Sequence, residues 1–348
     1  MASLNCFVCS LPFPEAGARY VKGKPVCPQC QNIVGDTETS AQPAAAAPAA
    51  APTSANQAAP RVVMPVNGGK LYFEHSGSAT AAGLFLMPAA GLGMAIAAGY
   101  AYALFSSWNP FIYVNGLGAI AAGFAIAFAI GQAGKFTDSR SLKLAAGIGL
   151  LSGFVTLWWC WAVWLQSSGY AASFSLAPGS VLAGISKAAA AEAWVIKGIT
   201  VSGLVIKIFW FLEALVLVGV PCFASTGMIS SAPYCERCRL WLPEPVTVEK
   251  FSPILEPDSF CSRVEKGDFS VVASLVPVGT VPGSYTRLEV SSCPSCQGLN
   301  TFSAVLCTLT PSEDGKEEDS LDEDYVVDQL LINRTVIDWV KQLPAVRD

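Results

Sequence analysis

The chain has 348 residues, of which 52% are hydrophobic and only 14% are charged, with a mean hydropathy of +0.46. These values fit a chain that is part membrane and part soluble. Residues 231–348 carry 19 Asp or Glu against 10 Lys or Arg, whereas the remainder carries 7 against 11. An acidic C-terminal part repels phosphate backbones, so no nucleic-acid partner is expected there.

The first 35 residues contain two cysteine pairs in the pattern Cys6-x2-Cys9-x17-Cys27-x2-Cys30. This spacing is typical of a four-cysteine zinc site, in which two hairpin turns each present two thiolates to a tetrahedral Zn2+. So short a segment has few large apolar residues to bury, and a structural metal ion is therefore expected to hold it together. We interpret residues 1–35 as a zinc-ribbon-like module.

Residues 36–77 are expected to form an Ala/Pro-rich linker, because the density of proline in 41–60 prevents a stable helix. A four-helix transmembrane domain is then expected over residues 78–226. No charged residue occurs between Ser76 and Gly134, a run of 59 residues, and a single span needs only about 20. Apolar segments of spanning length lie at 81–105, 111–131, 144–166 and 201–222, and Asn109–Pro110 marks the first turn.

The basic residues of the loops predict the orientation of these segments. Seven Lys or Arg lie on the side of the two chain ends and two lie on the other side. By the positive-inside rule, both termini are expected in the cytoplasm. The start of the sequence, which has no basic region followed by an apolar core, agrees with a cytosolic N-terminus.

Small residues recur every four positions along the second span, at Ala119, Gly123, Ala127 and Gly131, and again in the third span at Gly149 and Gly153. Small side chains at this spacing allow a neighbouring helix to approach closely. Packing inside one four-helix bundle is the preferred explanation, and a homo-oligomer is left open.

Glu213 lies near the middle of the fourth span, where a carboxylate is costly and commonly marks function. Two interpretations remain open. It is either a neutral, protonated or hydrogen-bonded carboxyl group that stabilises the bundle, with Tyr100, Tyr102 or Asn115 as partner, or a functional group that handles protons or ions. The structural interpretation is preferred, because one acid without further intramembrane charges makes a poor conduction path.

Residues 227–348 are expected to form a cytosolic β-rich domain, with strands at 269–278, 284–291, 301–310 and 325–332 and a short helix at 336–343. The acidic run 313–324 is interpreted as a solvated loop. Two further pairs, Cys235-x2-Cys238 and Cys293-x2-Cys296, predict a second zinc-ribbon-like site with a 54-residue insertion between them.

Disulfides and thiol redox chemistry are the alternatives for these cysteines. A cytosolic location disfavours disulfides. Cys27-Pro-Gln-Cys30 and Cys293-Pro-Ser-Cys296 resemble the CPxC motif of thiol oxidoreductases, but that motif normally acts alone. Here each CPxC is matched by a second CxxC pair. The preferred interpretation is therefore that the eight cysteines bind two structural Zn2+ ions.

The segments 110–116 (PFIYVNG), 210–215 (WFLEAL) and 234–241 (YCERCRLW) resemble those of an uncharacterised group of bacterial membrane proteins. These proteins join an N-terminal zinc-ribbon module to a four-span block. The resemblance covers most of residues 78–300. It implies insertion in a bacterial inner membrane and a zinc-bearing cytosolic end, and it implies no activity.

No enzyme activity is expected, because a single histidine beside a membrane span does not complete a Ser/His/Asp or Cys/His arrangement. This histidine, His75, stands in a polar stretch and is expected at the surface. A P-loop and a dinucleotide-binding fingerprint are also missing from the sequence. We therefore expect a membrane scaffold or adaptor whose cytosolic zinc modules bind a protein partner, with the lipid bilayer as its other partner. The alternative is a small transporter or ion-handling protein that uses Glu213.

Overall fold

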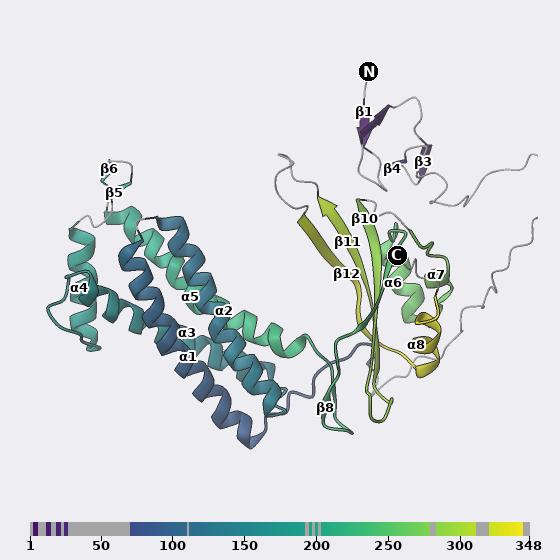
Figure 1. Cartoon of the computed structure of the whole chain (residues 1–348), viewed down its shortest axis with the longest axis horizontal. Helices are drawn as coiled ribbons and strands as arrows, with labels where there is room; N and C mark the ends of the chain where they lie inside the picture. The colour runs from purple at the N-terminus through teal and green to yellow at the C-terminus, as the bar shows by residue number, and fades with distance from the viewer. Residues whose placement is uncertain are drawn as a thin grey trace, which may run out of the picture. The chain divides into compact units, whose positions relative to one another are not determined.

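A computed structural model of the chain describes residues 70–343, apart from 110, 192–194, 197–198, 201–202, 279–282 and 311–319. Before residue 70 it describes four short strands, β1 (Ser3–Asn5), β2 (Pro12–Pro14), β3 (Arg19–Val21) and β4 (Lys24–Val26), which pair β1 with β2 and β3 with β4. The chain divides into two compact units (Figure 1). We call Glu74–Trp241 the helical unit, and Met1–Phe73 together with Leu242–Asp348 the sheet unit.

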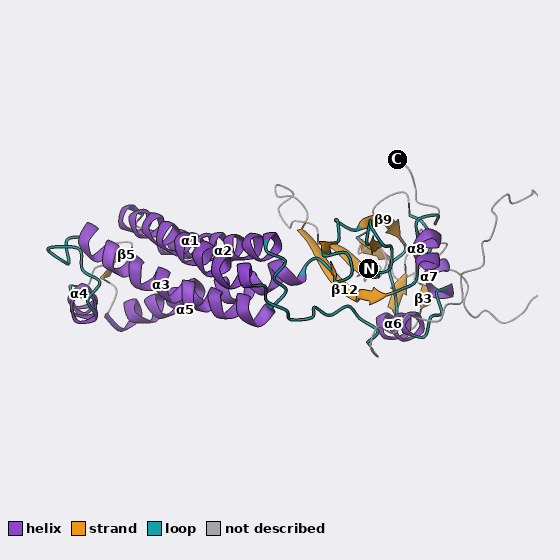
Figure 2. Cartoon of the chain, turned by 90° about the horizontal axis from the view of Figure 1, so that it is seen from below, coloured by secondary structure: helices purple, strands orange, loops and turns teal. Residues whose placement is uncertain are grey.

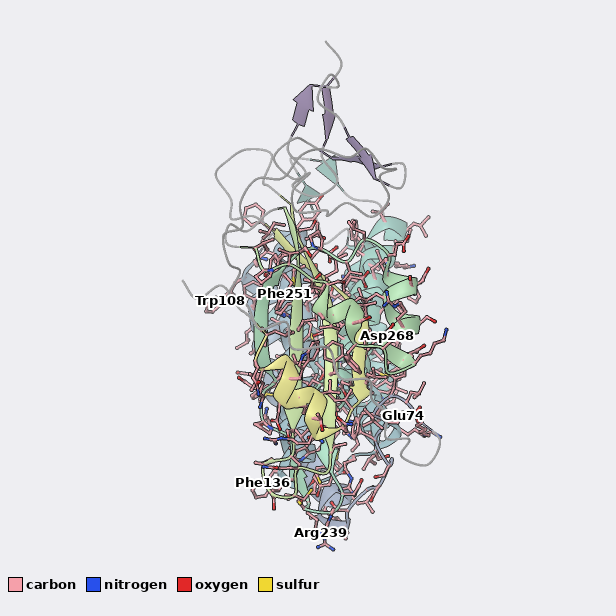
Figure 3. The ribbon with its side chains drawn as sticks, turned by 90° about the vertical axis from the view of Figure 1, so that its right-hand side faces the viewer. Glu74, Trp108, Phe136, Arg239, Phe251 and Asp268 are labelled. Carbon is pink, nitrogen blue, oxygen red and sulfur yellow. The ribbon has the colours of Figure 1, made fainter. Side chains whose placement is uncertain are left out.

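The helical unit is built from four helices that are long and apolar enough to cross a membrane (Figure 2). They are α1 (Ala81–Trp108), α2 (Ile112–Phe136), α3 (Leu142–Ser167) and α5 (Gly203–Ser230). The prediction of four such helices is confirmed. Both α1 and α2 end close to a largely exposed aromatic residue, Trp108 at 85% and Phe136 at 84% (Figure 3).

The four helices pack in a square in which α1 and α5 each lie against both α2 and α3. Helices α1 and α5 therefore face each other across the bundle. Glycines set the close approaches to α5: a Cβ on Gly153 would stand 2.7 Å from the Val218 Cα, and one on Gly149 would meet the Pro221 carbonyl. Gly123 and Gly131 on α2 have α5 side chains equally near. The small residues thus serve packing within the bundle, as preferred from the sequence.

A shorter helix, α4 (Pro178–Ala190), follows α3 in the chain. Its Val181 is buried in a cluster with Leu165 of α3 and Ile206 of α5. The short strands β5 (Val195–Ile196) and β6 (Ile199–Thr200) form a hairpin before α5 begins. Helix α4 is thus packed on the helices that flank it in sequence.

The sheet unit contains a four-stranded antiparallel sheet in the order β12-β11-β10-β9. The strands are β9 (Val246–Phe251), β10 (Ser284–Ser292), β11 (Asn300–Thr310) and β12 (Ser320–Leu331). Three helices accompany it, α6 (Pro257–Glu265), α7 (Ser270–Ala273) and α8 (Arg334–Val340). Their apolar residues and one face of the sheet form one core, which includes Phe251, Phe269, Phe302 and Trp339; Figure 3 labels Phe251.

Two predictions for this unit are wrong. Residues 269–278 form the short helix α7 and an isolated bridge from Pro277 to Phe251, not a strand. Their apolar pattern reflects burial in the core, with Phe269 and Val272 both fully buried, and a short buried helix can have the same apolar composition as a strand. The acidic run was also placed wrongly in part, because residues 320–324 belong to β12 and residues 311–319 lie outside the described part.

Candidate functional site

The first half of the candidate metal centre is a tight hairpin that follows α5. Strand β7 (Tyr234–Cys235) pairs with β8 (Leu240–Trp241), which places Cys235 opposite Leu240. Arg239 adopts a left-handed conformation with φ of 54°, and the reversal of the chain in so few residues requires such a position. Cys235 is buried and Cys238 is half-buried in this turn.

The second half is the connection between β10 and β11. Cys293 follows β10 directly, and the last register pair of the two strands joins Ser292 to Asn300. The Gln297 N–H donates to the Cys293 carbonyl at 3.0 Å, and the Gly298 N–H lies 3.4 Å from the Cys296 Sγ. A backbone N–H directed at sulfur stabilises the thiolate form that a metal ion requires.

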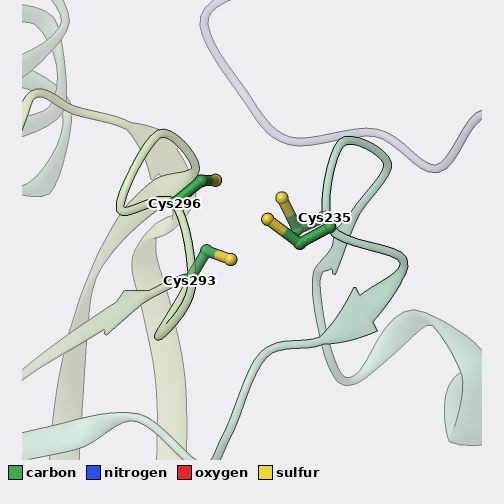
Figure 4. A group of neighbouring side chains, drawn as sticks. Cys235, Cys293 and Cys296 are labelled. Atoms are coloured by element: carbon green, nitrogen blue, oxygen red, sulfur yellow. The ribbon is translucent and has the colours of Figure 1, made fainter.

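The four sulfur atoms of Cys235, Cys238, Cys293 and Cys296 all lie within 4.8 Å of one another (Figure 4). Zinc bound at about 2.3 Å by four sulfurs in a tetrahedron would hold them about 3.8 Å apart. The donor set therefore fits a tetrahedral metal ion that favours thiolates. The sequence predicted this grouping from spacing alone, across 54 intervening residues. Cys6, Cys9, Cys27 and Cys30 lie outside the described residues, so the first predicted site stays a prediction.

Arg140, in the connection between α2 and α3, anchors the β7–β8 hairpin to the bundle. Its guanidinium carbon lies 4.2 Å from the centre of the Tyr234 ring, and its Nε is 2.9 Å from a carboxylate oxygen of Glu236. The same side chain donates to the Asp138 carbonyl at 2.5 Å and to the Ser76 hydroxyl at 3.3 Å. Only 8% of Arg140 is exposed. From the sequence, Arg140 is one of the seven basic residues on the side of the chain ends, and its contacts with the hairpin were not predicted.

Trp241 provides a second anchor for the hairpin. Its indole N–H donates to the Lys135 carbonyl at the end of α2 at 3.0 Å, and its ring packs on Tyr234. His75 lies with its ring centre 5.7 Å from that of Trp241. Burial, and after it the nearby Arg140, lowers the pKa of His75. The expected surface position of His75 is wrong, because the ring is half-buried beside the hairpin.

Glu213 receives a hydrogen bond from the Tyr102 hydroxyl, with 2.5 Å between Tyr102 Oη and Glu213 Oε1. Tyr102 is one of the three partners considered from the sequence, and it is 4% exposed. Tyr100 is half exposed. Asn115 instead accepts a hydrogen bond from the Asn109 amide at 2.8 Å, which secures the turn between α1 and α2.

A cavity of about 30 Å³ lies beside Glu213. It is lined by residues of all four long helices: Ser106, Asn115, Leu157, Cys160, Trp161, Trp164, Trp210, Glu213 and Leu217. The rings of Trp161 and Trp210 meet edge to face at 4.9 Å between centres. The sequence did not predict that tryptophans of the third span and Glu213 line one cavity.

Comparison of the chain with protein-family models, curated proteins and solved structures found no match.

Proposed function

We propose that this protein is an integral membrane scaffold or adaptor that carries structural zinc at its cytosolic end and binds a protein partner there. The observation that carries the proposal is the set of four cysteine sulfurs within 4.8 Å of one another. Four protein ligands complete a tetrahedral zinc shell, and structural zinc sites have this closed character, whereas catalytic ones keep a position for water.

The way the β7–β8 hairpin is held supports a structural role for the metal. Arg140 and Trp241 fasten the hairpin to the end of the helical unit through a ring contact, an ion pair and a backbone hydrogen bond. A rigid, anchored turn suits a scaffold. Beside Cys238, the turn exposes Glu236, Arg237, Arg239 and Leu240, which offers a protein partner both charges and an apolar contact.

The proposal places all four long helices in a bacterial inner membrane with both termini in the cytoplasm. Arg140 and the neighbouring Lys135 and Lys143 then lie on the cytosolic side, in agreement with the positive-inside rule. Zn2+ at both predicted cysteine sites, and no enzyme activity, complete the proposal.

A second candidate function is a small transporter or ion-handling protein. The cavity beside Glu213 favours it, since ionisable groups in membrane segments commonly face a polar space. Against it stands the Tyr102 hydrogen bond, which already satisfies one oxygen of the carboxyl group. Glu213 is also the only acidic residue of α1, α2, α3 and α5.

The adaptor role can be tested by affinity purification from native membranes in mild detergent with zinc retained. We expect one protein to co-purify stoichiometrically with the wild type and to be lost from a Cys235→Ser/Cys238→Ser variant. Cys222→Ser, a change in α5 outside the cluster, is the matched control and should retain the partner. Equal recovery of the partner with the cluster variant would contradict a role for the zinc module in binding.

A further inference from the structure

We propose that the cavity beside Glu213 is a binding site for one small monovalent cation. This site is separate from the cysteine cluster, and the proposal does not rest on the adaptor role. Its evidence is the chemistry of the cavity lining, which combines one carboxyl group, two further oxygen acceptors and the rings of three tryptophans.

The polar groups of the lining present acceptors. The Ser106 hydroxyl donates its hydrogen to the Ala103 carbonyl at 3.1 Å, so the lone pairs of its oxygen remain for a ligand. Asn115 Oδ1 accepts one hydrogen bond from Asn109, and a carbonyl oxygen has a second lone pair. Among the described residues, Glu213 accepts a hydrogen bond from Tyr102 at Oε1. Such a lining attracts a positive charge or a hydrogen-bond donor.

Among the described residues, the lining of the cavity contains no lysine or arginine that would neutralise an ionised Glu213. Lys207, the other charged residue of α5, is exposed. The Tyr102 hydroxyl donates to Oε1 of Glu213 at 2.5 Å. A carboxylate in so apolar a surrounding is expensive unless a cation neutralises it.

The tryptophans and the volume narrow the class of cation. Trp161, Trp164 and Trp210 all line the cavity and contact one another edge to face, and tryptophan is the aromatic residue that attracts cations most strongly. A volume of 30 Å³ admits about two water-sized particles. It therefore fits ammonium or an alkali-metal ion better than a bulky quaternary amine.

The test is titration of the purified full chain in detergent with NH4Cl and with KCl at constant ionic strength, balanced by the large cation N-methyl-D-glucamine. Tryptophan fluorescence and the melting temperature report binding, since three tryptophans line the site and a ligand that binds only the folded state stabilises it. We expect a saturable fluorescence change and a rise of several degrees in Tm. A response to ammonium alone would indicate hydrogen bonding by N–H groups, and an equal response to potassium would indicate coordination by charge alone; either supports the site.

Glu213→Gln should abolish the response, and Ser106→Ala, a smaller change at the same cavity, should weaken the apparent affinity several-fold. Lys207→Gln removes an exposed charge from the same helix and should titrate like the wild type. A change that does not saturate in the wild type, or one that persists unaltered in both Glu213→Gln and Ser106→Ala, would overturn the proposal.

Discussion

The Tyr102 hydroxyl of α1 donates a 2.5 Å hydrogen bond to Oε1 of Glu213 on α5, and so joins the two helices that face each other across the bundle. Contacts between neighbouring helices in this bundle are dominated by apolar and small residues. The Tyr102–Glu213 pair adds a polar constraint to the interior. A structural role and an ion-handling role for Glu213 predict different results when this hydrogen bond is changed.

If the pair is structural, Glu213→Gln keeps an acceptor for the Tyr102 hydroxyl and should fold with nearly unchanged stability. Glu213→Leu leaves that hydroxyl without its acceptor and should cost about 1–2 kcal/mol, as for a hydrogen bond in a membrane. Thermal unfolding in detergent measures both. Tyr102→Phe is the reciprocal control, and its effect should not add to that of Glu213→Leu. A well-folded Glu213→Gln protein that has lost its biological activity would favour the ion-handling function.

Helix α3 approaches α5 at Gly149 and Gly153, and larger side chains there should destabilise the bundle. A Cβ at Gly153 would stand 2.7 Å from the Val218 Cα and 2.8 Å from the Leu217 carbonyl oxygen. Within α5, the Leu217 carbonyl would normally accept a hydrogen bond from the N–H of residue 221, but Pro221 has no N–H. Gly153 therefore packs against a backbone carbonyl that lacks its helical donor. Gly153→Ala should cost about 1–3 kcal/mol by overpacking.

The same helix supplies the control for this change. Gly147 has no atom within 4 Å of the position that a Cβ would take. Gly147→Ala should therefore leave the thermal midpoint unchanged or raise it slightly through helix propensity. Equal thermal midpoints for Gly147→Ala and Gly153→Ala would contradict the close packing of α3 against α5 at Gly153.

Arg140 is expected to stabilise the metal site through the hairpin that it anchors. Arg140→Lys retains the positive charge but loses the planar guanidinium group. That group stacks on Tyr234 and at the same time bonds the Glu236 carboxylate and the Asp138 carbonyl. We expect this variant to release zinc to a chelator several times faster than the wild type. Lys143→Gln, an exposed change at the start of α3, should release zinc at the wild-type rate. Equal rates of zinc release from the wild type, Arg140→Lys and Lys143→Gln would contradict a stabilising role of Arg140 at the metal site.

The lowered pKa of His75 predicts a pH dependence of stability. Burial keeps the ring neutral in the folded protein, whereas the unfolded chain takes up a proton near the ordinary value of 6.5. The contribution of neutral His75 to the free energy of unfolding is therefore fully present above about pH 6.5 and is lost as the pH falls below that value. Melting temperatures between pH 5.5 and 8 should show a shallower acid slope for His75→Gln than for the wild type. Parallel slopes would contradict the assignment.

The long helices and the cysteine cluster could be predicted from the sequence because each depends on a local pattern. An apolar run of about 20 residues specifies a span by itself, and each CxxC pair specifies one turn. Residues 269–278 were misassigned because hydrophobic, β-branched composition does not distinguish a strand from a short buried helix such as α7. Helix α6, which begins with Pro257, and the edge strand β9 were not predicted, because each is too short to show a clear hydrophobic periodicity in the sequence.

The role of Arg140 and the cavity beside Glu213 could not be predicted, because both depend on residues far apart in the sequence. Arg140 contacts Ser76 on one side and Tyr234 and Glu236 on the other. Tyr102 stands 111 positions before Glu213. Only the packing of the four helices brings such residues together, and the periodicity of a single helix does not encode which neighbour it meets.

The central claim, structural zinc held by Cys235, Cys238, Cys293 and Cys296, is tested most directly by the metal content of the purified full chain. We predict close to two zinc ions per chain for the wild type and for Cys222→Ser, and one fewer when the four cluster cysteines are replaced by serine. An unchanged metal content in the fourfold variant, or a metal-free wild type whose cluster cysteines form disulfides, would contradict the account.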